Sequence, residues 1–314
     1  MNSPVLLQMC PFSNYLESGL AARGEILRWY ELDEPARTAW LAAQASRVQV
    51  VVTAGHVGCA TELLSALPSL RIVAINGVGV DRVDLAWARA HGVRVSTTPG
   101  TLSEDVADLA VGLTIALLRR IPTADAYVRQ GDWERHGEFP LARKVTGRRF
   151  GIVGLGNIGA AIAARLAAFG PIAYAGPRRK PVPYRYEPDV LTLARESDVL
   201  LIACPANAAT AGLIDAAVLD ALGPKGWLIN VSRGAIVHEE ALALALASGR
   251  IAGAGLDVFA DEPRVPLALR ESPSVVLTPH MASGTHETRE AMADLVLANI
   301  DAVLGGREPP TAVA

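Results

Sequence analysis

Residues 148–170, RRFGIVGLGNIGAAIAARLAAFG, join an apolar run to an alanine-rich segment through three closely spaced glycines. Gly154 can make a tight turn, Gly156 leaves the backbone open to a ligand, and Gly159 lets a helix pack closely against a strand. Free N–H groups at the start of that helix favour a bound phosphate. The segment therefore predicts a Rossmann-type unit that binds a dinucleotide, with a bare strand-to-helix turn as the alternative. The predicted contacts are Gly154, Leu155, Gly156, Asn157, Ile158 and Gly159.

Short apolar runs alternate with helix-length segments along most of the chain. Such alternation is typical of parallel strands joined by crossover helices. A first sheet is predicted from the runs at 5–9, 25–30, 48–54, 71–77 and 93–97. After a polar loop at 129–147, six further runs, from RRFGIVGLG to SVVLTPH, predict a second sheet. We therefore expect an α/β protein with two Rossmann-like or flavodoxin-like parallel-sheet domains.

The first domain is predicted to be discontinuous. Pro99 and Gly100 interrupt the chain after the fifth run. Near the other end, residues 285–305 have apolar side chains at helical spacing with no strand after them, so we expect this helix to return to the first domain. The expected division is 1–100 plus 284–314 for the substrate-binding (catalytic) domain and 101–283 for the dinucleotide-binding domain.

Composition favours a small-molecule partner. The chain has 29 basic and 32 acidic residues, and this balance gives no electrostatic case for binding nucleic acid or an anionic membrane. Its three cysteines are irregularly spaced, so neither a disulfide framework nor a metal site is predicted. The N-terminus, MNSPVLLQMC, lacks the basic region of a signal peptide. We therefore expect a reducing, cytoplasmic location.

The segment after the second strand of the dinucleotide-binding domain indicates which cofactor binds. An NAD site usually has an Asp or Glu there to hold the ribose 2′-hydroxyl. This chain instead has PRRKP, with Arg178, Arg179 and Lys180. Guanidinium groups suit a 2′-phosphate, so NADP(H) is predicted in preference to NAD(H), with Arg178 and Arg179 as its ligands. A solvated basic loop is the alternative interpretation.

Three later strand ends carry a cation, a carboxylate and an imidazole. Arg233 follows WLINV, Glu262 follows GAGLDVF, and His280 follows VVLTP. Together they suit the reduction of a carbonyl that neighbours a carboxylate: the arginine binds the carboxylate, the histidine donates a proton, and the glutamate fixes the imidazole. Each residue alone could be structural. Asp257, in an apolar run, is predicted to face the nicotinamide amide or to pair with a backbone donor.

These motifs, in order, resemble the D-isomer-specific 2-hydroxyacid dehydrogenases, and within them the glyoxylate/hydroxypyruvate reductase branch. The resemblance extends over NGVGVDRVDL, STTPGTLSEDVADLAVGL, GIVGLGNIG, LGPKGWLINVSRGAIVHEEAL, GRIAGAGLDVFADEP and PHMASGTHETREAMADLV. It implies catalytic roles for Arg233, Glu262 and His280, an active-site cleft between two domains, and a homodimer formed through the dinucleotide-binding domains.

The resemblance also implies further contacts. Backbone N–H groups of Val78 and Gly79 would bind the substrate carboxylate together with Arg233, and Trp133 or Phe139 would reach the partner subunit's site. The remaining expected cofactor contacts are Cys204, Pro205, Val231, Ser232, Asp257, Ser283 and Gly284.

The leading hypothesis from the sequence is an NADPH-preferring reductase of small 2-keto acids, glyoxylate and hydroxypyruvate, which forms the D-hydroxy acid where the product is chiral. Two alternatives stay open at this point. One keeps the chemistry with a larger 2-keto acid, such as 2-ketogluconate or an aryl pyruvate. The other is a dinucleotide-sensing binding protein on the same scaffold, because a fold alone does not fix a function.

Overall fold

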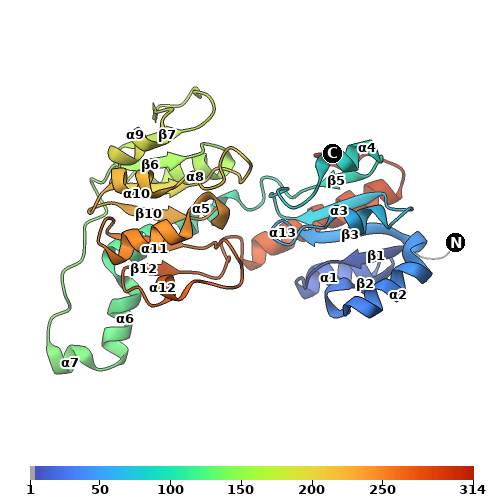
Figure 1. The fold of residues 1–314 in the computed structure, drawn as a ribbon, viewed down its shortest axis with the longest axis horizontal. Coiled ribbons are helices and arrows are strands. Elements are labelled where there is room, and N and C mark those ends of the chain that lie inside the picture. Colours follow the sequence, from blue (N-terminus) through green and yellow to red (C-terminus); the bar gives the residue numbers. More distant parts are fainter. Residues whose placement is uncertain (1–3) are drawn as a thin grey trace. The chain divides into compact units, whose positions relative to one another are not determined.

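The computed structural model describes residues 4–314 and contains two compact units (Figure 1). The first unit comprises the chain up to Leu102 together with Gly284–Ala314, and the second comprises Ser103–Ser283. Each unit is built on one sheet in which every strand pairing is parallel. This architecture confirms the predicted α/β class with two parallel-sheet domains.

The first unit has a five-stranded sheet in the order β2-β1-β3-β4-β5. Its strands are β1 (Val5–Gln8), β2 (Glu25–Arg28), β3 (Val48–Ala54), β4 (Ile72–Asn76) and β5 (Arg94–Ser96). Its helices are α1 (Asn14–Ala21), α2 (Glu34–Gln44), α3 (Thr61–Ser65), α4 (Leu85–Ala90) and α13 (His286–Leu304). All residues of β4 are buried, as expected for an inner strand of a parallel sheet that is covered on both faces.

Helix α13 closes one face of this sheet although it is distant in sequence. Its residues Ala293, Val296 and Ile300 belong to one buried cluster with side chains of β1, β3 and β4. Thr285 caps the helix by accepting a hydrogen bond from the Thr288 N–H at 3.2 Å. At the other end, the Arg71 guanidinium donates to the Leu304 carbonyl at 3.2 Å, which satisfies a carbonyl that the helix leaves unpaired.

The second unit has a seven-stranded sheet in the order β12-β11-β10-β9-β6-β7-β8. Its strands are β6 (Phe150–Val153), β7 (Ile172–Ala175), β8 (Arg185–Tyr186), β9 (Val199–Ile202), β10 (Trp227–Asn230), β11 (Gly253–Leu256) and β12 (Val275–Leu277). Its helices include α5 (Ser103–Arg119), α8 (Asn157–Leu166), α9 (Val190–Arg195), α10 (Ala216–Leu222), α11 (Glu239–Ala247) and α12 (Leu267–Arg270).

The expectation of six strands in this sheet is wrong by one. The additional strand, β8, pairs with β7 at the edge of the sheet and has only two residues. It is held by its tyrosine, because the Tyr186 hydroxyl donates to the Gly176 carbonyl at 2.9 Å and its ring lies 5.3 Å from that of Tyr174. A polar pair of this length has no apolar periodicity by which the sequence could reveal it.

Two helices of the second unit extend away from its sheet (Figure 1). They are α6 (Ile121–Arg129) and α7 (Asp132–His136), and neither has a buried residue. We call residues 121–141 the arm. It exposes large apolar side chains with these relative accessibilities: Ile121 49%, Val128 55%, Trp133 62% and Leu141 97%. Phe139 instead packs inside the arm, with its ring 5.3 Å from that of Tyr127.

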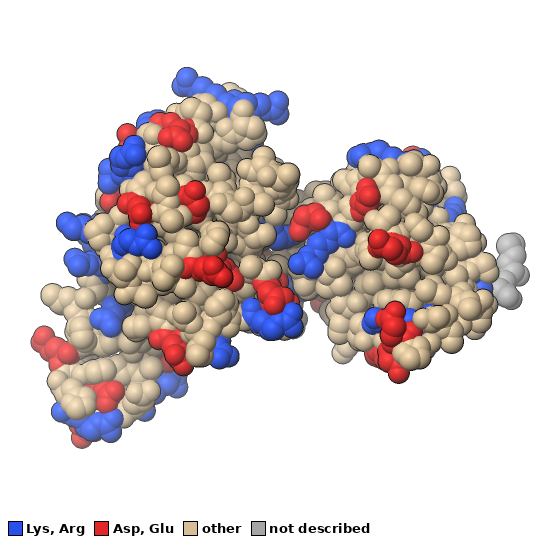
Figure 2. Space-filling view, in the orientation of Figure 1, with Lys and Arg blue, Asp and Glu red and all other residues tan. Residues whose placement is uncertain are grey.

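On the face that Figure 2 shows, basic and acidic side chains are both scattered over a largely uncharged surface. Among residues 4–314, no helix is long and apolar enough to cross a membrane. The same residues contain no group of three His, Cys, Asp or Glu side chains that could hold a metal ion.

Candidate active site

Three neighbouring strands of the second unit end in a row. Asn230 at the end of β10 pairs with Leu256 at the end of β11, which pairs with Leu277 at the end of β12. Arg233, Glu262 and His280 lie in the loops that follow these strands. The parallel register therefore delivers the three predicted catalytic side chains to the same edge of one sheet.

Glu262 and His280 form a direct pair. The Glu262 Oε2 atom lies 2.7 Å from His280 Nδ1, and both side chains are partly exposed. The other carboxylate oxygen, Oε1, accepts the Phe259 N–H at 3.0 Å. The carboxylate is thus anchored to its own loop, and it fixes the imidazole by accepting a hydrogen bond from Nδ1–H.

His280 adopts an uncommon backbone conformation, with φ of 52°. A residue with a Cβ atom rarely takes this left-handed conformation unless its surroundings impose it. Asp257 supplies that constraint. Its carbonyl accepts the His280 N–H at 2.8 Å, and its carboxylate accepts N–H groups of Met281 at 2.9 Å and Ala282 at 3.0 Å.

The Asp257 side chain is fully buried, and burial raises its pKa, although the hydrogen bond from the Thr278 hydroxyl at 2.6 Å acts in the opposite direction. Both carboxylate oxygens are occupied by these donors. Of the two interpretations of Asp257, pairing with backbone donors is the one that the structure contains. Contact with a nicotinamide amide stays a prediction.

Arg233 is positioned by a second buried polar side chain. Asn230 is 1% exposed; its amide nitrogen donates to the Arg233 carbonyl at 3.0 Å and its amide oxygen accepts the Ser232 N–H at 3.0 Å. The asparagine thereby closes the turn from which the arginine projects. Its role was missed from the sequence. The signal was present as a polar residue at the end of the apolar run WLIN.

Each glycine of the glycine-rich turn has a separate structural role. Gly154 has φ of 95°, and a Cβ there would come within 2.6 Å of the Cys204 Cα. A Cβ on Gly159 would lie 2.0 Å from the Gly154 carbonyl oxygen. Helix α8 can therefore approach the turn only because residue 159 has no side chain. Around Gly156 there is open space. These are the features that a turn needs to cradle a pyrophosphate, and the residues fit a dinucleotide.

The other predicted cofactor positions differ in exposure. Leu155, Cys204 and Val231 are buried, whereas Pro205 and Gly284 are exposed. Burial raises the pKa of the Cys204 thiol to about 11, so it stays neutral at physiological pH. The Ser232 hydroxyl donates to the Cys204 carbonyl, which ties the β9 and β10 loops together. Asn157 and Ile158 begin helix α8, and Ser283 is partly buried.

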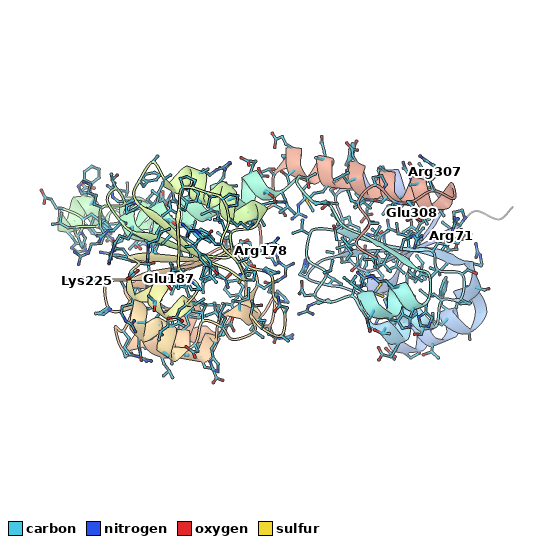
Figure 3. All side chains as sticks on the ribbon, turned by 90° about the horizontal axis from the view of Figure 1, so that it is seen from above. Arg71, Arg178, Glu187, Lys225, Arg307 and Glu308 are labelled. Atoms are coloured by element: carbon cyan, nitrogen blue, oxygen red, sulfur yellow. The ribbon has the colours of Figure 1, made fainter. Side chains whose placement is uncertain are left out.

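The basic segment after β7 lies beside the glycine-rich turn. The Lys180 ammonium donates to the Leu155 carbonyl, and the Lys180 N–H donates to the Tyr174 hydroxyl at 2.7 Å. Arg178 and Arg179 are exposed. The first acidic residue after β7 is Glu187. Its Oε2 atom lies 3.5 Å from Nη1 of Arg185. Figure 3 labels Glu187 and Arg178. The segment between β7 and Glu187 therefore contains no carboxylate side chain.

Val78 and Gly79 follow β4 at the carboxyl end of the first unit's sheet. Val78 is 39% exposed. Within residues 4–314, neither residue donates its N–H to another backbone oxygen. The contact of these N–H groups with substrate stays a prediction.

Comparison with known proteins identifies the family. Residues 111–282 match the family model described as the D-isomer specific 2-hydroxyacid dehydrogenase, NAD binding domain. The chain belongs to this family. It is an oxidoreductase, and the resemblance that its motifs indicated is confirmed.

Similar proteins cover the whole chain. A hydroxyphenylpyruvate reductase from Plectranthus scutellarioides is 48% identical over 96% of both chains. A glyoxylate/hydroxypyruvate reductase from Arabidopsis thaliana is 47% identical over 100% of both. The crystal structure of an NADPH-dependent glyoxylate/hydroxypyruvate reductase from Sinorhizobium meliloti, in complex with NADP and malonate, superposes with a TM-score of 0.93 at 43% identity over 100% of this chain and 97% of that one.

We expect Gly156→Ala to weaken NADPH binding without unfolding the dehydrogenase. Gly156 has φ of −77° and open space around it, so alanine fits the fold, yet its methyl group would occupy the approach to the turn. The dissociation constant from protein fluorescence should rise by about tenfold or more, which is ~1.4 kcal/mol. Gly112→Ala, at an equally open position in helix α5, is the control. Unchanged affinity in the Gly156 variant would contradict a pyrophosphate site.

Proposed function

We propose that this dehydrogenase uses NADPH to reduce small 2-keto acids, glyoxylate and hydroxypyruvate, to 2-hydroxy acids, with the D configuration where the product is chiral. The proposal rests chiefly on the Glu262–His280 pair at 2.7 Å, which shares a sheet edge with Arg233 and the glycine-rich turn. The names of the Arabidopsis and Sinorhizobium relatives support the substrate and the cofactor.

Different side chains of this protein have different roles in such a reduction. Arg233 binds the substrate carboxylate and orients the neighbouring carbonyl. His280 donates a proton to the carbonyl oxygen as negative charge develops on it. Glu262 accepts a hydrogen bond from Nδ1–H and so keeps the imidazole in the orientation that the transfer needs. NADPH, when bound, supplies the hydride for the carbonyl carbon.

We expect the purified protein to oxidise NADPH in the presence of glyoxylate or hydroxypyruvate, followed as loss of absorbance at about 340 nm. His280→Ala should lower kcat by about 10²-fold or more, because general acid catalysis contributes that much, while the NADPH dissociation constant stays unchanged. A His280→Ala variant with full activity would refute the assignment of the proton donor.

A larger substrate is the second candidate, and the Plectranthus hydroxyphenylpyruvate reductase favours it. The discriminating measurement is kcat/KM with glyoxylate, hydroxypyruvate and hydroxyphenylpyruvate under the same conditions. A higher value for the aryl pyruvate would replace the proposed substrate class and keep the chemistry.

The preference for NADPH is expected to depend on Arg178 and Arg179. Both are exposed, and the segment between β7 and Glu187 has no carboxylate to bind a ribose 2′-hydroxyl. Replacing both with alanine should raise KM for NADPH by about tenfold or more through loss of charge-assisted hydrogen bonds, with KM for NADH nearly unchanged. Equal effects on both cofactors would contradict a 2′-phosphate site.

We propose further that the dehydrogenase is a cytoplasmic homodimer in which a second copy of this chain covers the arm. An exposed apolar surface of this kind is characteristic of an interface. Phe139 already packs against Tyr127 and the Arg120 guanidinium, so Trp133 is the better candidate to enter the partner's site.

Val128→Asp combined with Trp133→Asp is expected to convert the dimer to monomers, because charged groups would be buried at the interface. Light scattering after gel filtration measures the molar mass. Leu267→Asp is the control, since Leu267 is an equally exposed apolar side chain (55%) on α12, outside the arm. A monomeric wild-type protein, or a dimeric double variant, would contradict the proposal.

A further inference from the structure

Two of the catalytic loops touch through a glycine. Gly234 follows Arg233, and a Cβ on it would lie 1.9 Å from the Phe259 carbonyl carbon and 2.3 Å from the Ala260 nitrogen. The backbone after Arg233 therefore packs directly on the backbone of the loop that carries Glu262. This close packing limits how near the two loops can come. A further interaction is needed to hold them together.

Glu239 provides a hydrogen bond across the same junction. It is the first residue of helix α11, which begins shortly after the turn that contains Gly234. Its Oε1 atom accepts the Ala260 N–H at 2.8 Å. Ala260 stands next to Phe259, whose own N–H is held by Glu262 at 3.0 Å. Two glutamates thus bind consecutive N–H groups of one loop, one from within the loop and one from the neighbouring element.

We propose that Glu239 is a positioning residue for the reduction: by holding the Ala260 N–H, its carboxylate keeps the loop of Glu262 in register with the loop of Arg233. The inference rests on the proposed function of these residues. Hydrogen bonds connect Glu239 to the imidazole in steps, so its effect is transmitted through Ala260, Phe259 and Glu262 to the Nδ1 atom of His280.

The chain offers a matched control. Glu240 is the next residue of α11, is exposed, and lies in the same acidic first turn. Replacing either glutamate with alanine removes one carboxylate from the same helix terminus, so the two variants share the change in the interaction with the helix dipole. Only Glu239 holds the Ala260 N–H. A difference between the variants therefore reports on that hydrogen bond.

The experiment compares Glu239→Ala, Glu240→Ala and Glu239→Gln with the wild type. Glu239→Ala is expected to lower kcat for the keto acid by about tenfold or more, because a misplaced catalytic group costs that much, while the NADPH dissociation constant is unchanged. Glu240→Ala should match the wild type. Glutamine keeps an acceptor oxygen, so Glu239→Gln should recover most of the lost kcat. Equal kcat for both alanine variants, or no recovery by glutamine, would overturn the inference.

A second measurement does not depend on turnover. The proton between His280 Nδ1 and Glu262 should give a low-field proton resonance, assigned by its absence from His280→Ala. We expect the resonance to persist in Glu240→Ala and to shift or disappear in Glu239→Ala. An unchanged resonance in Glu239→Ala would refute the positioning role, even if the wild type reduced none of the keto acids. If the wild type shows no turnover but the resonance shifts in Glu239→Ala, only the proposed function is rejected.

Discussion

The site depends on the parallel register of β10, β11 and β12. Because Asn230, Leu256 and Leu277 form one row across the sheet, the chain leaves all three strands at the same level. Arg233 and His280 each lie three residues beyond that row. A slip of one residue in either pairing would turn the inward-facing side chains outward and would move a proposed catalytic group by about 3.3 Å.

The strand register alone does not orient the side chains. Buried polar groups also fix the conformation of the loops that carry them. Asn230 closes the turn before Arg233, and Asp257 holds the left-handed turn at His280. Leaving such buried groups without partners would cost about 1–3 kcal/mol each, so the conformation that satisfies them is strongly preferred. These hydrogen bonds therefore favour one conformation of the loops that carry the proposed catalytic side chains.

The sequence is informative where one residue type has one physical use. Gly154 and Gly159 stand where any Cβ would collide with backbone, and alternating apolar runs reveal both parallel sheets. It is silent where the meaning of a residue depends on a distant partner. Nothing in the sequence near Glu239 indicates that its carboxylate reaches Ala260, and β8 is too short for any periodicity. Asp257 is an unusual residue for an apolar run, but only the structure shows which donors surround it.

The discontinuity of the first unit has a consequence for how the chain folds. The bond from Arg71 to Leu304 joins residues 233 positions apart, and α13 covers apolar side chains of β1, β3 and β4. During synthesis, the part of that face that α13 covers stays exposed until the last helix leaves the ribosome, although α1 can cover the rest earlier. The second unit is contiguous and can complete its core earlier. The order of maturation is therefore the reverse of the order of synthesis, and the N-terminal sheet is the part of the nascent chain with the longest exposure to aggregation.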